Sequence, residues 1–214
     1  MSAAPAWTLV VPVKPARIGK SRLGADVGVV RAIALDTIVA ASRASLVGRV
    51  IVVTGDRELV AALADAGVAA EIVDDEPPRG LAGAIRAGLD RADLVHPRAV
   101  LLGDLPALDP SDLDDALVSA ATVPRAFVPD AEGAGSSLVT ALGGVELVEA
   151  FGADSARRHR ELGLIELPVP VGSGLRRDVD TPEQLREAAA SVGTFTGAAL
   201  AALTAGSAAQ IHGE

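Results

Sequence analysis

The sequence predicts an α/β protein built on a Rossmann-like, doubly wound and mostly parallel sheet. Short runs rich in Val, Leu and Ile recur along the chain, and they are apolar at successive positions. Strands that helices cover on both faces have this composition. Stretches with helical spacing separate these runs, and such an alternation of strand and helix is typical of a parallel sheet.

Four strands and four helices follow from these patterns, with helices between successive strands. The expected strands are Thr8–Val13, Val50–Thr54, Ala99–Leu102 and Ala126–Val128. The expected helices are approximately Val30–Ser42, Glu58–Ala66, Leu81–Arg91 and Ser111–Ala120. Because half of the residues are hydrophobic and only 2% are aromatic, the core must consist mainly of aliphatic side chains.

Composition limits the classes of protein to which the chain can belong. Its 214 residues suit one domain, which we assign to residues 1–192, followed by an Ala- and Gly-rich tail at 193–214. The tail is expected to hold a short helix and to be partly disordered. The formal net charge of −9 argues against a nucleic-acid partner, and no apolar run is as long as a membrane span. The absence of cysteine fits a reducing compartment and favours a cytoplasmic protein, whose oligomeric state the sequence leaves open.

A basic loop follows the first expected strand in the stretch LVVPVKPARIGKSRL. It contains Lys14 and Lys20, the only two lysines of the chain, together with Arg22. The stretch ends like a phosphate-binding P-loop, but Lys14 stands where that motif needs a glycine. Because ligands of doubly wound sheets bind beyond the carboxyl ends of the strands, we still expect this loop to bind an anion.

A carboxylate stands at a second strand end, in the stretch AVLLGDLPAL. Asp104 comes directly after a buried run and Gly103, so its side chain is expected to face the ligand crevice. A cap or turn residue is the alternative for Asp104, although Asp109 and Ser111 suit that purpose better. We favour a metal ligand, because hard Mg²⁺ binds carboxylate and phosphate oxygen together.

A third group of charges lies in GLRRDVDTPEQL. Either Asp180 or Thr181 is expected to cap a helix whose first residue is Pro182. Asp178 is not needed for that cap, and the spacing of Asp178 and Asp180 can place two carboxylates on one side of an extended chain. Together with Asp104 they would suffice for one or two Mg²⁺ ions, whereas a solvated charge cluster is the alternative interpretation.

Two further loops carry small residues that suit anion binding. In DAEGAGSSL, glycines and Ser136 would offer N–H and hydroxyl donors, although an ordinary hairpin turn explains the pattern equally well. In AFGADSARRH, Asp154 or Ser155 is expected to cap a helix whose first N–H groups face an anion, and His159 is expected on its surface. The chain offers no cysteine, no nucleophile elbow and no metal-spaced histidine pair. Carboxylates, basic residues and glycine loops favour transfer between phosphates.

Several motifs occur together in the chain: VVPVK, GKSRL, GDLPAL, the Gly-x-Gly-Ser loop, FGADS and GLRRDVDTP. In this combination the chain resembles the CofC/FbiD family of guanylyltransferases in deazaflavin coenzyme F-420 biosynthesis. The resemblance covers about residues 7–185 and implies a nucleotide-diphospho-sugar transferase (GT-A-like) fold. It further implies Mg²⁺-dependent transfer of GMP from GTP to a phosphorylated three-carbon acid. The motifs FGADS and RRDVDTP resemble those of the actinobacterial branch, whose acceptor is phosphoenolpyruvate, whereas archaeal members use 2-phospho-L-lactate.

The resemblance assigns a role to each matching position. The catalytic residues would be Lys14, Lys20 and Asp104, and the metal ligands Asp104, Asp178 and Asp180. The nucleotide would be bound by Pro12, Lys14, Lys20, Arg22, Gly80, Gly83 and Gly103. The acceptor would be bound by Ser136, Gly152, Ser155 and Arg176. The chain departs from the family at Ala82, where an asparagine near the nucleotide is usual, and at Ser136, where threonine is common.

Other functions stay open from the sequence alone. Guanylyl transfer to 2-phospho-L-lactate or 3-phosphoglycerate would use the same residues. A nucleotidyltransferase that makes a nucleotide sugar or a molybdenum-cofactor dinucleotide would need a Gly-rich, Arg-containing first loop, which KPARIGKSRL does not match. A dinucleotide-binding oxidoreductase would need Gly-x-Gly-x-x-Gly after the first strand, and a non-catalytic domain would bind neither GTP nor Mg²⁺.

Overall fold

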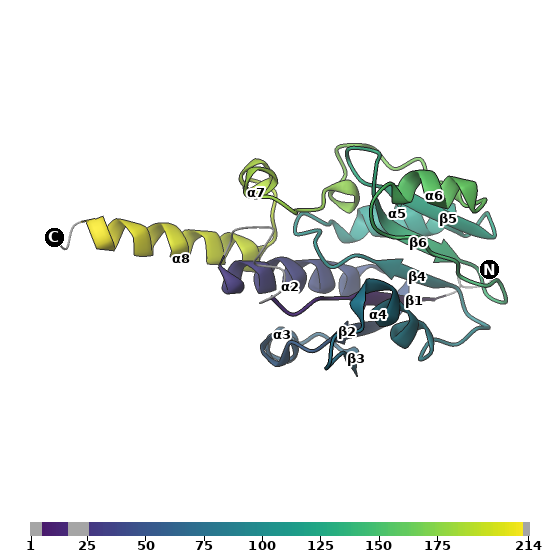
Figure 1. Ribbon diagram of the computed structural model, residues 1–214, viewed down its shortest axis with the longest axis horizontal. Helices are drawn as coiled ribbons and strands as arrows, with labels where there is room; N and C mark the ends of the chain where they lie inside the picture. Colours follow the sequence, from purple (N-terminus) through teal and green to yellow (C-terminus); the bar gives the residue numbers. More distant parts are fainter. Residues whose placement is uncertain (1–5, 17–25, 212–214) are drawn as a thin grey trace.

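The computed structural model describes residues 6–16 and 26–211 and contains a seven-stranded sheet with the order β3-β2-β1-β4-β6-β5-β7 (Figure 1). The strands are β1 (Trp7–Pro12), β2 (Val47–Thr54), β3 (Ala70–Asp74), β4 (Arg98–Leu101), β5 (Arg125–Pro129), β6 (Ser136–Ala141) and β7 (Ile165–Glu166). The helices are α2 (Val27–Arg43), α3 (Arg57–Asp65), α4 (Gly80–Leu89), α5 (Pro110–Ala120), α6 (Ser155–Glu161), the 3₁₀ helix η1 (Gly174–Arg176), α7 (Pro182–Ala188) and α8 (Thr194–Ile211).

The doubly wound, mostly parallel sheet expected from the sequence is confirmed. The four expected strands correspond to β1, β2, β4 and β5, and the four expected helices to α2, α3, α4 and α5. The sequence patterns did not reveal β3, β6 and β7. Of these, β6 runs antiparallel to both of its neighbours, β4 and β5.

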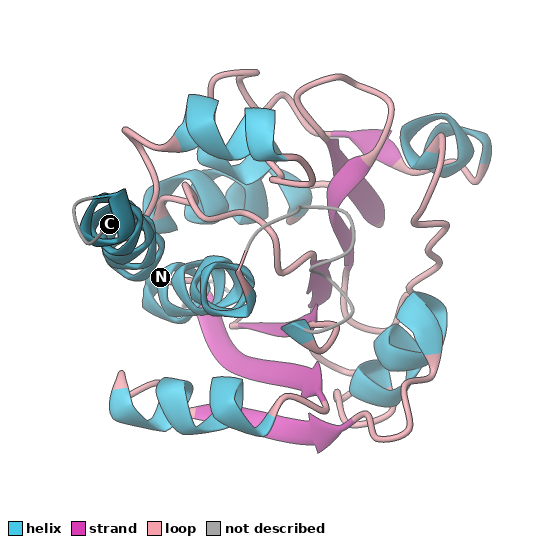
Figure 2. Cartoon of the chain, turned by 60° about the vertical axis from the view of Figure 1, so that its left-hand side comes forward, coloured by secondary structure: helices cyan, strands magenta, loops and turns pink. Residues whose placement is uncertain are grey.

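Helices cover both faces of the sheet, which explains why its central strands are apolar on both sides (Figure 2). Leu9 and Val11 of β1 belong to the same core cluster as buried side chains of α2, α3 and α5. The residue between them, Val10, packs on the opposite face with Ala84 and Ile85 of α4. The alternation of side chains along one strand therefore supplies both layers of the core.

The direction of winding changes between β1 and β4, which pair in parallel at the centre of the sheet. From β1 the chain continues to β2 and β3 on one side, and it then crosses to β4 on the other. A crevice for ligands forms at the carboxyl ends of two strands related in this way. Continuing the register of Val10 with Val100 along the two strands brings Lys14 opposite Asp104. A Cβ atom at Gly103 would lie 2.9 Å from Val13 Cγ2, so glycine permits the close approach of the strand ends.

The hairpin of β5 and β6 extends this edge of the sheet. Strand β6 is antiparallel to β4, so its first residues lie beside the carboxyl end of β4. The N–H of Leu102 donates to the carbonyl of Ser137 across a distance of 3.0 Å. The loop between β5 and β6 therefore opens at the same edge as Lys14 and Asp104.

The C-terminal segment forms α8, which is longer than the short helix expected and extends away from the sheet beside α2 (Figure 1). The carboxylate of Asp36, buried on α2, accepts hydrogen bonds from the N–H groups of Phe195 (3.1 Å) and Thr196 (2.7 Å). These bonds satisfy two of the free N–H groups at the start of α8. Among the described residues, no helix is both long and apolar enough to cross a bilayer.

Candidate active site

Lys14 and Asp104 follow the ends of β1 and β4, the two strands between which the winding direction changes. Lys14 is exposed just beyond β1, and Asp104 follows β4 after Leu102 and Gly103. The N–H of Val179 donates to the backbone carbonyl of Asp104 at 3.0 Å. This bond carries the segment after η1 across the end of β4, so Val179 and its neighbours lie beside Asp104.

The charges of Asp104, Asp178 and Asp180 influence one another at this point. Burial raises the pKa of Asp104 to about 6, the charge of Asp180 adds to the increase, and the ammonium of Lys14 opposes it. Burial, followed by the charge of Asp104, raises the pKa of Asp178 to about 7. The three carboxylates therefore lie within electrostatic reach of one another, and Lys14 lies within reach of Asp104, although these residues come from three separate parts of the sequence.

This cluster has the character of a cation site. Asp104 Oδ1 and Asp178 Oδ1 are buried and have no hydrogen-bond partner among the described residues. Buried polar atoms are normally paired, and carboxylates forced together without a counter-ion repel one another. Oxygen ligands of this kind suit a hard divalent cation, which would satisfy both oxygens and offset the repulsion.

The structure adds two acidic residues that the sequence analysis did not include. One carboxylate oxygen from each of Asp130, Glu132 and Asp178 can be chosen so that all three lie within 4.8 Å of one another. Asp130 also accepts hydrogen bonds from the N–H groups of Ala134 and Gly135, so its carboxylate already holds the glycine loop. The signal for Asp130 was available, because it directly follows β5 as Asp104 follows β4.

Of the two expected caps of α7, Asp180 and Thr181, the structure shows Thr181. Its hydroxyl accepts a hydrogen bond from the N–H of Gln184, and the Gln184 amide accepts from the Thr181 N–H in return. This reciprocal capping box leaves the Asp180 carboxylate free to face the cluster. Asp109 caps α5, as expected, by accepting from the N–H of Ser111 at 2.8 Å.

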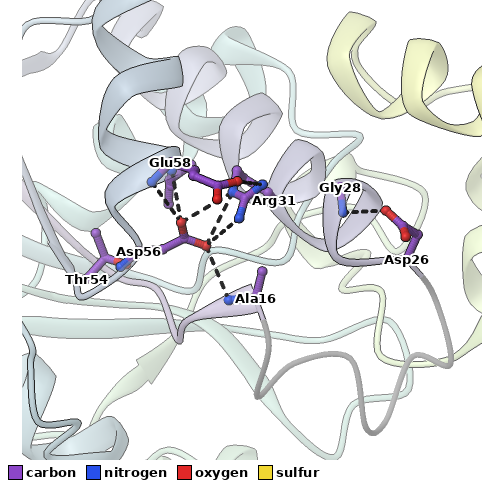
Figure 3. Close-up of polar contacts among 8 residues, drawn as sticks. Ala16, Asp26, Gly28, Arg31, Thr54, Asp56 and Glu58 are labelled. Carbon is purple, nitrogen blue, oxygen red and sulfur yellow. Dashed lines mark hydrogen bonds and ion pairs between the residues drawn. The ribbon is translucent and has the colours of Figure 1, made fainter.

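The chain on either side of the basic loop is anchored by two aspartates (Figure 3). Asp56 caps α3 through the N–H groups of Glu58 (3.0 Å) and Leu59 (3.1 Å). It also accepts from the N–H of Ala16 at 3.4 Å and pairs with Arg31 at 3.3 Å. Burial acts to raise the pKa of Asp56, but hydrogen bonds from Leu59 and Arg31 outweigh it and lower the pKa.

Replacing Asp56 with alanine is expected to lower the free energy of unfolding by about 2–3 kcal/mol, because a helix cap is lost and Arg31 loses a partner. Urea denaturation measures the change. Asp26→Ala is the matched control, because Asp26 caps α2 through only one N–H, that of Gly28, and should cost about 1 kcal/mol. Equal losses in the two variants would contradict the anchoring role of Asp56.

The predicted acceptor residues gather around the glycine loop and the start of α6. Ser136 is the first residue of β6, Ser155 is the first residue of α6, and both are buried. The N–H of Ala156 donates to the carbonyl of Ala134 at 3.1 Å, which joins α6 to the glycine loop. The hairpin interpretation of this loop is confirmed by the pairing of β5 with β6. Binding of an anion by the same loop stays a prediction.

Some predicted features of this region differ in the structure. Asp154 occupies the cap position of α6 with φ of 54°, but its side chain makes no capping hydrogen bond. Arg176 is buried, and its guanidinium donates to the backbone carbonyls of Asp130 and Val169. Arg176 therefore holds the start of the glycine loop, and its contact with a substrate stays a prediction.

The other predicted nucleotide-binding residues are distributed along the same edge. Pro12 ends β1 and is buried. Gly80 and Gly83 lie in the first turn of α4, which follows β3, and no hydrogen bond of the described residues links them to the acidic cluster. Lys20 and Arg22 fall outside the described residues, so their roles stay predictions.

His159, which we expected on the helix surface, is fully buried. Its ring lies 5.4 Å from each of the Phe127 and Phe151 rings. The Ala150 N–H donates to Nε2 at 2.9 Å, and Nδ1 lies 2.9 Å from Ser136 Oγ. A helix of seven residues is too short for its spacing to have revealed which face is buried.

This burial predicts a loss of stability in acid. Burial, and secondarily the charge of Arg158, lowers the pKa of His159 to about 4. The unfolded chain binds a proton near pH 6.5, so stability contributed by neutral His159 is present above pH 6.5 and is lost as the pH falls toward 4, by about 2–3 kcal/mol. Urea denaturation at pH 7 and pH 4.5 should show a smaller loss in His159→Gln than in wild type. His96→Gln, at an exposed histidine, is the control, and equal losses in all three proteins would contradict the prediction.

Comparison with known proteins agrees with this architecture. Residues 17–166 match the family of MobA-like NTP transferase domains. A solved nucleotidyl transferase from Methanothermobacter superposes with a TM-score of 0.57 at 18% identity, over 86% of this chain and 96% of that chain. A CMP:2-keto-3-deoxy-manno-octonic acid synthetase in complex with CTP gives a TM-score of 0.54 at 16% identity, over 85% and 96%. The fold and the family match define the chain as a nucleotidyltransferase.

Relatives of higher sequence identity show to which family of nucleotidyltransferases the chain belongs. A phosphoenolpyruvate guanylyltransferase of Streptomyces coelicolor is 44% identical over 207 residues, which cover 92% of this chain and 97% of the relative. A phosphoenolpyruvate guanylyltransferase of Thermomonospora curvata is 43% identical over 207 residues, which cover 93% and 89%. The chain belongs to the phosphoenolpyruvate guanylyltransferase family.

Proposed function

We propose that this protein transfers GMP from GTP to phosphoenolpyruvate with the aid of Mg²⁺, giving enolpyruvoyl-2-diphospho-5′-guanosine and diphosphate for coenzyme F-420 biosynthesis. The observation that supports this proposal is the electrostatic coupling of Asp104 to Asp178, Asp180 and Lys14, in a chain of this family. Acidic ligands for a cation facing a cationic side chain are what transfer between phosphates requires.

The proposed reaction needs no protein nucleophile. An oxygen of the acceptor phosphate, already ionised at neutral pH, attacks the α-phosphorus of GTP. The new P–O bond forms as the bond to the β-phosphate oxygen breaks, and diphosphate leaves. This chemistry agrees with a site that offers carboxylates and cations and in which the buried His159 has other partners.

The proposed metal ligands are Asp104, Asp178 and Asp180, and the buried unpaired oxygens of Asp104 and Asp178 fit a divalent cation. When bound there, Mg²⁺ would neutralise charge on the phosphates and on the departing diphosphate. Lys14 would bind the triphosphate from the opposite strand end and stabilise the charge that develops on the leaving group. Lys20 and Arg22 are proposed to add further cations from the same loop.

Further proposals concern the acceptor site, the limits of the domain and the location of the protein. Ser136, Gly152 and Ser155 are proposed to bind the acceptor through hydroxyl and N–H donors, beside the acidic cluster that the glycine loop borders. Residues 1–192 are proposed as the nucleotidyltransferase domain, with 193–214 as an appended segment. We propose a cytoplasmic location, which agrees with the absence of cysteine.

Diphosphate release tests the proposal. The protein is incubated with GTP and Mg²⁺ and, separately, with phosphoenolpyruvate, 2-phospho-L-lactate or 3-phosphoglycerate. We expect release with phosphoenolpyruvate, and loss of activity in EDTA. Parallel reactions with ATP test the preference for guanine that Ala82 brings into question. Release with 2-phospho-L-lactate alone would overturn the acceptor, and release with none of the three acids would overturn the reaction.

A further inference from the structure

The hydrogen bonds of His159 determine which ring nitrogen carries the proton. A backbone N–H can only donate, so the bond from Ala150 requires that Nε2 be an unprotonated acceptor. The neutral ring therefore carries its proton on Nδ1, and that N–H donates to Ser136 Oγ at 2.9 Å. The Phe127 and Phe151 rings pack against the imidazole and fix its orientation.

This arrangement restricts the hydroxyl of Ser136. Because Oγ accepts the proton of His159, its own hydrogen must point away from the imidazole. Ser136 begins β6 beside the end of β4, where the glycine loop opens toward the acidic cluster. No other hydrogen bond of Ser136 Oγ is found among the described residues, so its hydrogen is not committed to any of them.

His159 also connects the two loops that carry the predicted acceptor residues. Through Ala150 it holds the beginning of the loop that contains Gly152, and Arg158 holds the same loop by donating to the Phe151 carbonyl at 3.0 Å. Through Ser136 it reaches the end of the glycine loop. A single buried ring thus bridges both loops without being exposed to the crevice.

We propose that His159 is a positioning residue for the acceptor: it turns the hydroxyl of Ser136 so that its hydrogen points to an anionic oxygen of the bound acid. The proposal rests on the proposed function, which places the acceptor at Ser136. His159 does not touch the substrate and acts through Ser136.

Two conservative variants separate the two contacts of the ring. The amide of asparagine occupies roughly the place of Nδ1 and can still donate to Ser136. The amide of glutamine reaches roughly the place of Nε2, where it can accept the hydrogen bond of the Ala150 N–H but cannot donate to Ser136. His159→Gln should therefore raise the KM for phosphoenolpyruvate about tenfold, the effect of one hydrogen bond, while His159→Asn should raise it by no more than about threefold. Neither variant should change the KM for GTP by more than about twofold.

A double-mutant cycle links the effect to Ser136. In a Ser136→Ala background, His159→Gln should give no further increase in the KM for phosphoenolpyruvate, because the hydroxyl that it orients is gone. His96→Gln serves as a control at an exposed histidine, and circular dichroism checks the fold of each variant. His159→Asn is the milder change, and its KM values decide the matter if His159→Gln does not fold.

The outcomes distinguish this inference from the function on which it rests. Wild-type protein that releases no diphosphate with phosphoenolpyruvate would overturn the proposed function, and the role of His159 with it. Active wild-type protein would overturn the positioning role alone in any of three cases. In the first, His159→Gln raises the KM for phosphoenolpyruvate no more than His159→Asn does. In the second, the KM for GTP rises as much as the KM for phosphoenolpyruvate. In the third, His159→Gln and Ser136→Ala have additive effects on the KM for phosphoenolpyruvate. With His159→Asn alone, a rise of tenfold or more in the KM for phosphoenolpyruvate would have the same meaning.

Discussion

Asp104→Asn is expected to reduce the rate of diphosphate release by at least about 100- to 1,000-fold while leaving the fold intact. Asparagine keeps the shape of the side chain but removes the charge that a cation would bind. The same substitution should not destabilise the protein in EDTA, because it removes one charge from a buried cluster in which Asp180 and Asp178 repel Asp104. Turnover is measured with GTP, phosphoenolpyruvate and Mg²⁺, and stability is measured by thermal unfolding with and without the metal.

Asp109→Asn is the matched control for this experiment. Asp109 lies five residues further along and caps α5 from an exposed position. Its replacement should leave turnover unchanged and cost at most about 1 kcal/mol, because asparagine is itself a good cap. Wild-type turnover in Asp104→Asn would eliminate the metal role of this carboxylate. Strong stabilisation of Asp104→Asn by Mg²⁺ would also argue against that role.

Lys14→Ala is expected to lower kcat about 100-fold with little change in stability. Lys14 is exposed beyond β1, so few packing contacts are lost, and the free energy of unfolding should change by no more than about 0.5 kcal/mol. The loss of activity follows from removal of a cation that faces Asp104 across the change of winding direction. Steady-state diphosphate release and urea denaturation measure the two effects.

The control and the conservative variant sharpen this prediction. Arg57 is an exposed cation at the start of α3, shortly after the neighbouring strand β2, and Arg57→Ala should leave kcat unchanged. Lys14→Arg keeps the charge but has a larger, planar head group, so it should recover only part of the activity. Comparable losses of activity in Arg57→Ala and Lys14→Ala would mean that general surface charge, and not a specific contact, supports the reaction.

The central strands and the strand-end residues could be predicted because their signals are local. A buried apolar run followed by a polar residue identifies β1 with Lys14 and β4 with Asp104. The convergence of Asp178 with Asp104 depended on a hydrogen bond between Val179 and Asp104, which no sequence spacing reveals. The positions of the acidic residues were therefore predictable, whereas the distances between them were not.

The parts that were missed depend on contacts between distant residues. Helix α8 is uncharged and lacks a polar face, and the carboxylate that caps it, Asp36, lies about 160 residues earlier in the chain. Strand β6 begins within a loop whose glycines and serines indicated a turn. His159 is buried because Phe127 and Phe151 approach it from different elements. In each case tertiary packing outweighed the local pattern.

Between β4 and β6, parallel pairing gives way to antiparallel pairing. This seam separates two groups of proposed roles: residues at the ends of the parallel strands are assigned to the triphosphate, and residues of the hairpin and of the segment that follows it to α6 are assigned to the acid. Related enzymes could thus accept a different acid by changing the hairpin and its loops, while their binding of the nucleotide stays the same. Engineering of acceptor choice should begin on the hairpin side of the seam.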